Sequence, residues 1–201
     1  MTASSACLVW KHHRISSLHC HSSEDLGRYL SKSAHDLARG DSFKTRLSAF
    51  LTPEVFPIFL YRLSHYLYVS GRPRVALVVA RINQLLHKVN ITPQSCIGPG
   101  FRLPHPAGVT FHGRAGRGLT LYSLAICCAH SNEPSGTLDR CPCLGDQVTV
   151  AGHAVVQGAV VIGDRTTIAY QVQLERDAPP DVVVASRSMR VHTRRRDEFD
   201  K

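Results

Sequence analysis

The chain has 201 residues, a length typical of one domain or of one domain with a small second one, and its 43% hydrophobic content allows a sizeable core. The net charge of +9 raises the possibility of nucleic-acid binding. However, a cluster of basic residues lies between Arg187 and Arg196, and no nucleic-acid-binding motif accompanies it, so we interpret the excess as a solvated tail and expect no nucleic-acid partner.

The cysteine content and the hydropathy pattern favour a cytoplasmic protein. There are 7 cysteines, and the odd count, the chain length and the lack of a signal-peptide pattern argue for a reducing compartment. No run of the sequence reaches the roughly 18 apolar residues that a membrane span needs. We therefore expect no disulfide framework and no membrane association.

Residues 1–22 are predicted to form a disordered arm. The arm carries a cluster of potential ligands, His12, His13, His19, Cys20 and His21. Zinc binding is one interpretation, but the spacing matches no structural zinc pattern, and loose tails rich in serine and histidine are common. We expect no metal site.

Residues 23–89 are predicted to form a helical domain. Ser23 to Ala38 has a serine cap with acidic residues in its first turn, as a helix start requires. Helices are also predicted over 58–69 and 75–89, separated by Gly71 and Pro73. The last of these helices is expected to bury seven apolar side chains: Val75, Leu77, Val78, Val79, Ile82, Leu85 and Leu86.

The next segment repeats every six residues, a period that matches neither a single helix nor a single strand. Glycine follows the repeating aliphatic residue at Gly98, Gly116, Gly145 and Gly163. The aliphatic positions are Ile91, Ile97, Leu103, Val109, Ala115 and Leu121, and then Leu144, Val150, Val156, Ile162, Ile168 and Leu174.

This period is typical of a parallel β-helix, in which a short strand and a tight corner alternate. Three repeats make one triangular coil, so the segment supplies about four coils. We predict a fold of the α+β class, with the β-helix over 90–185, a protruding loop over 127–143 and a basic polar tail over 186–201. The loop is either the binding face or a tolerated insertion.

Several segments resemble the serine O-acetyltransferases. The helical part contains YRLSHYLY at 61–68, which is similar to that family's YRxxHxLY. Further along, NITP at 90–93 stands in the place of DIHP, and LPHPAGV at 103–109 resembles LPHPxGI, a variant of LDHxTGI. DRCP at 139–142 matches three residues of DRHP, and DAPP at 177–180 resembles DVPP. Together they cover more than half of the chain.

This resemblance implies a left-handed β-helix that assembles as a homotrimer or as a dimer of trimers. It also implies acetyl transfer from acetyl-CoA to the hydroxyl of serine or a related small hydroxylated substrate, and a place in cysteine biosynthesis. Some relatives dock a C-terminal isoleucine into cysteine synthase. This chain ends in Phe199, Asp200 and Lys201, so that partnership is not implied.

The resemblance identifies His105 as the catalytic base. A histidine suits the removal of a hydroxyl proton because its usual pKa lies near working pH. Pro104 and Pro106 flank His105 and are expected to hold its backbone extended. Asn90 stands where the family has the aspartate that orients the base; its amide oxygen can accept the ring proton but adds no negative charge.

The predicted substrate-binding residues are Arg140, Cys141 and Pro104. Arg140 is retained and can pair with a substrate carboxylate through two hydrogen bonds. Cys141 replaces a family histidine, and Pro104 replaces the aspartate that contacts the amino acid in the family. These changes allow an acceptor other than serine.

The predicted acetyl-CoA site lies at two turns, one with Ala151 and Gly152 and one with Ala169 and Tyr170. Small residues there let the cofactor approach. Tyr170 stands where the family has alanine, so CoA binds in a shifted pose, the donor differs, or the groove is closed. His153 either faces this groove or lies on the surface.

Two functions of different class therefore remain. His105, Arg140 and the LPHPAG segment favour an O-acyltransferase. Asn90, Cys141 and Tyr170 favour a catalytically degenerate trimer that binds or scaffolds. The cysteines around the loop are interpreted mostly as small buried hydrophobic residues.

Overall fold

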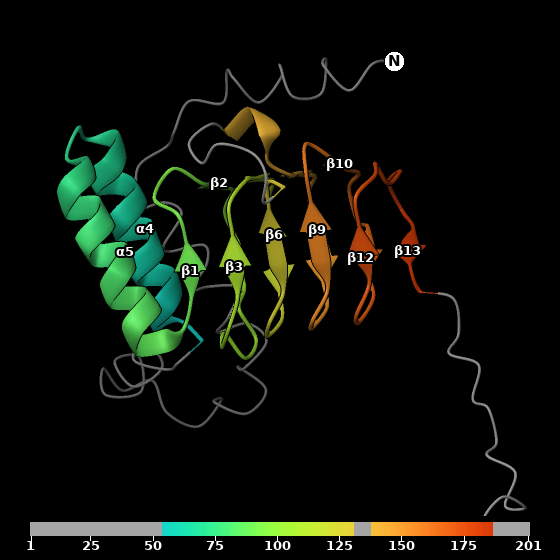
Figure 1. Ribbon diagram of the computed structural model, residues 1–201, viewed down its shortest axis with the longest axis horizontal. Coiled ribbons are helices and arrows are strands. Elements are labelled where there is room, and N and C mark those ends of the chain that lie inside the picture. The colour runs from blue at the N-terminus through green and yellow to red at the C-terminus, as the bar shows by residue number, and fades with distance from the viewer. Residues whose placement is uncertain (1–53, 131–137, 187–201) are drawn as a thin grey trace, which may run out of the picture.

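The computed structural model describes residues 54–130 and 138–186; the expected arm, the helix over Ser23 to Ala38 and the basic tail lie outside these residues. Two helices come first, α4 (Phe56–Val69) and α5 (Pro73–His87). Parallel strands in three sheets follow (Figure 1). Neither described helix is long and apolar enough to cross a bilayer.

Each strand is two or three residues long, and successive strands join the sheets in turn, so the chain forms a three-sided solenoid. The first sheet has the order β1 (Asn90–Ile91), β3 (Thr110–Phe111), β6 (Ile126–Cys128), β9 (Val155–Gln157), β12 (Gln173–Leu174). The second contains β2 (Cys96–Ile97), β4 (Arg114–Ala115), β7 (Cys143–Leu144), β10 (Val161–Ile162). The third contains β5 (Thr120–Leu121), β8 (Thr149–Val150), β11 (Thr167–Ile168), β13 (Val183–Val184).

The repeat of six produces the core because each repeating residue, and the residue two positions before it, lies inside the solenoid. Leu121 and Leu119, for example, are fully buried, as are Val150 and Val148. Cys127 is also fully buried and takes an inward position of the same kind in β6. The loop predicted from Cys127 therefore begins later in the chain, after Cys128 at the end of β6.

The predicted register is wrong at Val109. Ile91 pairs with Phe111, and Phe111 pairs with Cys127, so Phe111 holds the repeating position and Val109 the position two before it. Both side chains are fully buried, which is why the sequence alone did not separate them.

The YRLSH segment of α4 covers the first end of the solenoid. The Tyr61 hydroxyl donates to the Ser95 carbonyl at 2.8 Å and accepts from the Ile97 amide at 3.2 Å. Arg62 is buried and donates to the carbonyls of Ile97 and Gly98. His65 Nδ1 lies 2.8 Å from the Pro93 carbonyl, to which it donates. Helix and coil are therefore joined by side chains that satisfy backbone groups at the open end.

The expectation for α5 is wrong. Of its residues Ala76 and Asn83 are buried, and Asn83 Nδ2 donates to the Pro57 carbonyl at 2.9 Å. Most of the side chains expected inside are exposed instead, including Leu85 at 72% and Leu86 at 65%. Helix α5 contacts α4 through Ala76, through Asn83 and through the His87 ring, which packs edge-on against Phe56 with centroids 5.6 Å apart. Its wide apolar side faces outward in the described part of the chain.

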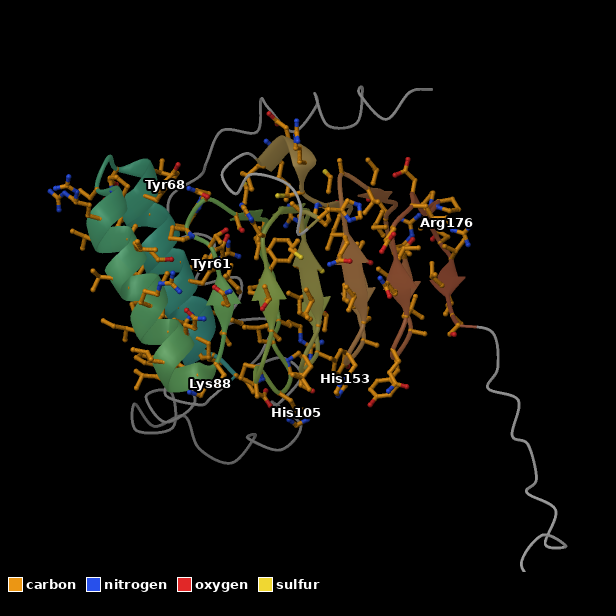
Figure 2. All side chains as sticks on the ribbon, in the orientation of Figure 1. Tyr61, Tyr68, Lys88, His105, His153 and Arg176 are labelled. Atoms are coloured by element: carbon orange, nitrogen blue, oxygen red, sulfur yellow. The ribbon has the colours of Figure 1, made fainter. Side chains whose placement is uncertain are left out.

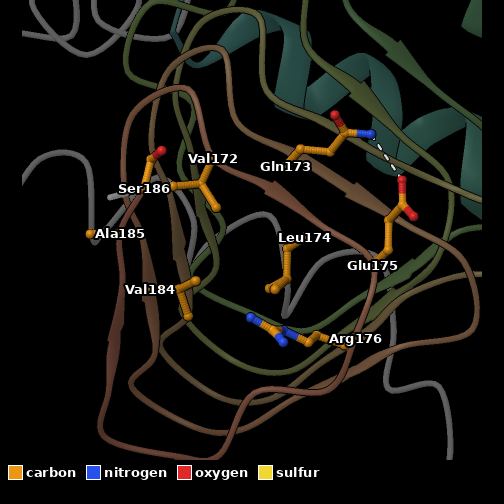
Figure 3. Close-up of a pocket in the computed structure, with 8 residues that line it drawn as sticks. All are labelled: Val172, Gln173, Leu174, Glu175, Arg176, Val184, Ala185 and Ser186. Carbon is orange, nitrogen blue, oxygen red and sulfur yellow. Dashed lines mark hydrogen bonds between the residues drawn. The ribbon is translucent and has the colours of Figure 1, made fainter. Parts of the chain in front are cut away.

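At the other end of the solenoid lies a pocket of about 570 Å³ (Figure 3). Its walls come from the last coils, where Leu174 and Val184 meet the charged side chains of Glu175 and Arg176. There the Gln173 side-chain amide Nε2 donates a hydrogen bond to the Glu175 carboxylate at 2.8 Å. The described chain ends at Ser186 beside this pocket.

Candidate active site

His105 lies on an enlarged corner of the solenoid. Eight positions separate inward-facing Leu103 from Phe111, whereas four separate Phe111 from Ala115, instead of six and six. The corner before β3 therefore has two extra residues, and the next corner is shorter by two. The extra length lets the corner project beyond the others without changing the register of the following sheets.

The backbone of this corner is tightly fixed. His105 is exposed and has φ of +57°, so the expected extended conformation is wrong; the residue is in the left-handed region despite the flanking prolines. The Gly108 amide donates to the Lys88 carbonyl at 3.0 Å, and the Leu124 amide donates to the Ala107 carbonyl at 3.0 Å. The corner is thus held between its neighbours on both sides.

We call the corners that join the third sheet to the first the His105 edge: residues 103–109, 122–125, 151–154 and 169–172. Lys88 begins this line, since it also has a left-handed backbone, with φ of +58°. His153 and Gln171 continue it, because their amides donate to the carbonyls of Ser123 and Gly152. Figure 2 shows Lys88, His105 and His153 along one side of the molecule.

Asn90 lies beside the strand that leaves the His105 corner. Its amide donates to the Val109 carbonyl at 2.8 Å, and it pairs in register with Thr110. Within the described residues no hydrogen bond joins the Asn90 side chain to the His105 ring. Its orienting role therefore stays a prediction.

The predicted substrate-binding residues do not gather in one chain. Pro104 lies on the His105 corner, but Arg140 and Cys141 lie at and just after η2 (Leu138–Arg140), which follows the far end of β6. Because strands of the first sheet are parallel, the start of β3 and the end of β6 are at opposite edges of that sheet. Figures 1 and 2 show this separation.

The η2 segment is anchored on the second sheet. Arg114 donates to the Leu138 carbonyl and to the Asp139 carboxylate, each at 3.2 Å. Arg140 is exposed, while Cys141 is buried at 4% exposure, so its thiol is not presented to solvent. Arg140 and Asp139 are therefore the exposed members of this segment.

The two predicted donor turns do come together. Ala151 and Ala169 lie on successive coils of the His105 edge, next to Gly152 and Tyr170 respectively. The Tyr170 ring is 57% exposed and packs edge-on against the His153 ring, with centroids 5.3 Å apart. Tyr170 also lies over Gly152, where an added Cβ would be 3.5 Å from the ring.

The described cysteines have the environment of packed side chains. Cys127, Cys141 and Cys143 are buried, and burial strongly raises the pKa of the Cys127 thiol. Burial likewise raises the pKa of Cys96. Residues 54–130 and 138–186 contain no group of three potential metal ligands; the His-rich arm lies outside them.

Sequence reasoning missed Lys88 and Leu124, whose main chains bond to Gly108 and Ala107 of the His105 corner. Neither residue belongs to a motif, and both lie close to it only because the coils stack. The detectable signal is the stacking itself: residues one coil apart on the same corner become neighbours.

Comparison with known proteins gives one consistent relationship, although no family model matches. A serine acetyltransferase of Mycobacterium tuberculosis is 29% identical over 137 residues, covering 67% of this chain and 58% of the relative. A plasmid-encoded serine acetyltransferase of Synechococcus elongatus is 26% identical over 176 residues, covering 83% and 55%. The chain thus spans little more than half the length of these relatives.

The solved structures show the same fold. The serine acetyltransferase of Neisseria gonorrhoeae superposes with a TM-score of 0.71 at 22% identity, covering 84% of this chain and 63% of that one. A serine acetyltransferase in complex with CoA gives a TM-score of 0.71 at 18% identity, with 87% and 69% coverage. The chain is therefore similar in sequence to serine acetyltransferases, at 26–29% identity, and shares the fold of their solved structures.

Proposed function

We propose that this protein is an O-acyltransferase that moves an acetyl group from acetyl-CoA to the hydroxyl of serine or a related small hydroxylated substrate. The observation that carries the proposal is His105, an exposed imidazole on a projecting, rigidly held corner. The similarity to serine acetyltransferases, one solved with serine and one with CoA, supports it. Cysteine biosynthesis in the cytoplasm is the matching cellular role.

In this mechanism a ring nitrogen of His105 accepts the proton of the substrate hydroxyl as its oxygen attacks the thioester carbonyl. The carbon–sulfur bond breaks, and the proton passes to the departing thiolate. Asn90 acts as a positioning residue: its amide oxygen accepts a hydrogen bond from the N–H of the other ring nitrogen and so orients the imidazole. The Ala151 and Ala169 turns are where the pantetheine arm of CoA lies.

We further propose a left-handed solenoid and a homotrimer. The separation of His105 from Arg140 within one chain supports the trimer, because a threefold arrangement can present the η2 segment of one copy to the His105 edge of the next. Arg140 then clamps the substrate carboxylate. The exposed apolar side of α5 is a candidate surface for pairing two trimers. In this proposal residues 23–89 form the helical domain and 90–185 the acyltransferase domain.

The test is release of free CoA from acetyl-CoA with serine, homoserine and a panel of small hydroxylated amines. The His105→Ala variant should lose about 10²–10⁴-fold in kcat, the usual contribution of a general base. His153→Ala, an exposed histidine on the same edge that packs on Tyr170, is the comparison variant; its effect should fall on the KM for acetyl-CoA, with kcat changed far less than in His105→Ala. Equal turnover by wild type and His105→Ala would contradict the proposal.

The second candidate is a binding or scaffolding trimer without turnover. It is favoured by the packing of Tyr170 across Gly152 and against His153, which narrows the predicted donor path. It predicts a stable trimer that releases no CoA with any acceptor. An acceptor-dependent rate that is lost in His105→Ala would exclude it.

A further inference from the structure

Leu124 is an exposed aliphatic residue in the middle of the His105 edge. Its amide donates to the Ala107 carbonyl of the His105 corner at 3.0 Å. On the other side of Leu124, the His153 amide donates to the Ser123 carbonyl at 3.1 Å, and His153 belongs to the corner of the first predicted donor turn. Figure 2 shows His105 and His153 on this side of the molecule. Leu124 therefore lies between the candidate base and the predicted donor path.

The side chain of Leu124, as well as its main chain, is placed against the His105 corner. It lies over Gly108, because a Cβ added to that glycine would collide with the Leu124 side chain and would be 3.2 Å from its Cγ. Leu124 nevertheless remains 44% exposed. One part of the residue is thus packed on the His105 corner, and the other part is open to contact with a bound molecule.

The backbone conformation of Leu124 is unusual for an aliphatic residue. Its φ is +59°, in the left-handed region, where any side chain costs free energy relative to glycine. The other non-glycine residues with positive φ in the described chain all carry polar or charged side chains: Lys88, His105, Gln147, His153, Arg165, Gln171 and Asp181. The exposed part of Leu124 gains nothing from burial that would offset this cost. The fold alone therefore does not account for a leucine at this corner.

The distances that acyl transfer requires bring the acyl group close to this corner. The substrate hydroxyl must lie about 3 Å from a ring nitrogen of His105, and its oxygen must come within about 3–3.5 Å of the thioester carbon. Successive coils are only about 4.8 Å apart, so the coil that carries Leu124 lies within this combined reach. A donor that extends from the Ala151 and Ala169 turns to His105 has to cross the corner of Leu124.

We propose that Leu124 contacts the acyl group of the donor and selects a short, uncharged aliphatic chain, so that propionyl-CoA is a donor as well as acetyl-CoA. The inference rests on the proposed acyl transfer and defines its donor class. A leucine side chain gains from burying a further methyl group, whereas it offers no partner to a carboxylate that leaves water. The reaction is unchanged: the alcohol oxygen bonds to the acyl carbon, the carbon–sulfur bond breaks, and the hydroxyl proton passes through His105 to the thiolate. The products are the acyl ester and free CoA.

The experiment compares acetyl-CoA, propionyl-CoA and malonyl-CoA as donors, using the full chain and the acceptor that is turned over fastest. The propionyl and malonyl groups differ at one end, where a methyl group is replaced by a carboxylate. We expect kcat/KM for propionyl-CoA to equal that for acetyl-CoA or to exceed it by up to about 4-fold, the contribution of one buried methylene. It should exceed that for malonyl-CoA about 10-fold. A propionyl-CoA value below either of the others would overturn the inference while leaving the acyl transfer intact.

The role of Leu124 is tested by Leu124→Asn and Leu124→Met. Asparagine is similar in size to leucine, is polar and tolerates the left-handed backbone, whereas methionine keeps an apolar side chain. The ratio of kcat/KM for propionyl-CoA to that for acetyl-CoA should fall about 4-fold in Leu124→Asn and stay within about 2-fold in Leu124→Met. Leu85→Asn makes the same change at an exposed leucine of α5 and is the control, with an unchanged ratio expected. An unchanged ratio in Leu124→Asn would overturn the assignment of Leu124.

Assembly and binding are measured on the same proteins, so that the two proposals fail in different ways. If light scattering shows a changed assembly in Leu124→Asn while the donor ratio is unchanged, a neighbouring copy covers Leu124 and the inference is wrong. If no donor releases CoA with any acceptor, the proposed acyl transfer is wrong, and the contact with the acyl group is decided by calorimetry. Equal affinities of the wild-type protein for propionyl-CoA and malonyl-CoA would then overturn it.

Discussion

The attachment of α4 to the solenoid makes Arg62→Met a sharp test of the structure. Arg62 is 3% exposed and donates to the carbonyls of Ile97 and Gly98, the latter at 2.7 Å. Methionine keeps the length and the apolar stem but leaves both carbonyls without this donor. A hydrogen bond to a charged group contributes about 1.5–3 kcal/mol, so losing two should lower the free energy of unfolding by about 3–5 kcal/mol.

The assay is urea unfolding followed by circular dichroism at one protein concentration, since assembly would otherwise shift the midpoint. With a denaturant dependence of about 2 kcal/mol per molar urea, the midpoint should fall by about 1.5–2.5 M. The control is Arg72→Met, an exposed arginine between the two helices, which should change stability by less than about 0.5 kcal/mol. Equal effects of the two substitutions would refute the conclusion that Arg62 joins α4 to the first end of the solenoid.

Four further predictions concern the corners and the titrating groups. Gly98→Ala should lower the free energy of unfolding by about 1–3 kcal/mol, because the added Cβ would lie 2.6 Å from the Gly116 carbonyl oxygen. In the same urea assay Gly152→Ala should lower it less, because the nearest atom to its Cβ would be 3.3 Å away. Burial lowers the pKa of His65 from its usual 6.5, so the unfolded chain binds a proton at a higher pH than the folded chain does. The melting temperature should therefore drop as the pH falls below about 6.5, and His65→Gln should make the melting temperature depend less on pH. Tyr170→Ala should tighten CoA binding at least 3-fold by calorimetry, whereas Tyr170→Phe should leave it unchanged. Asn90→Asp should raise kcat if Asn90 orients His105, and an unchanged or lower rate would remove that role.

The solenoid was predictable from the sequence because its period comes directly from the geometry. Each corner brings one aliphatic residue back to the interior after six positions, and glycine is needed where coils approach closely, as at Gly98 beside Gly116. The error at Val109 has the same origin. Val109 and Phe111 lie two positions apart and both face inward. The sequence alone therefore does not reveal that the corner before them has two extra residues.

The exposure of α5 was not predictable from hydropathy. An apolar helix surface indicates that the helix buries area against something, but not whether the partner is α4, another part of the chain or another copy. In the described residues, the contact with α4 includes Ala76, Asn83 and the His87 ring, which packs on Phe56. The exposed apolar surface of Val78, Ile82 and Leu85 lies outside this contact. Identifying its partner requires distances between segments, which the one-dimensional pattern lacks.

The candidate site was predicted residue by residue, but its arrangement was not. His105 was identified through the LPHPAG resemblance, and the structure adds a left-handed backbone and a projecting corner. Arg140 was expected in the same site, yet it lies at the opposite edge of the first sheet. The spacing of residues along the chain does not show which of the three edges a residue occupies until each residue has been assigned to a coil.

The family motifs fall into two groups when their contacts are compared. Tyr61 and Arg62, which match the family pattern, bond to the backbone of the first coil, so replacing them exposes unsatisfied carbonyls and amides. Pro104 and Tyr170, which depart from it, lie on the His105 edge, where the fold does not depend on their side chains in this way. A chain can therefore keep the serine acetyltransferase fold while its edge adapts to another acceptor. This is why the acetyl-transfer proposal rests on His105 and not on the fold, and why the fold alone does not identify the acceptor.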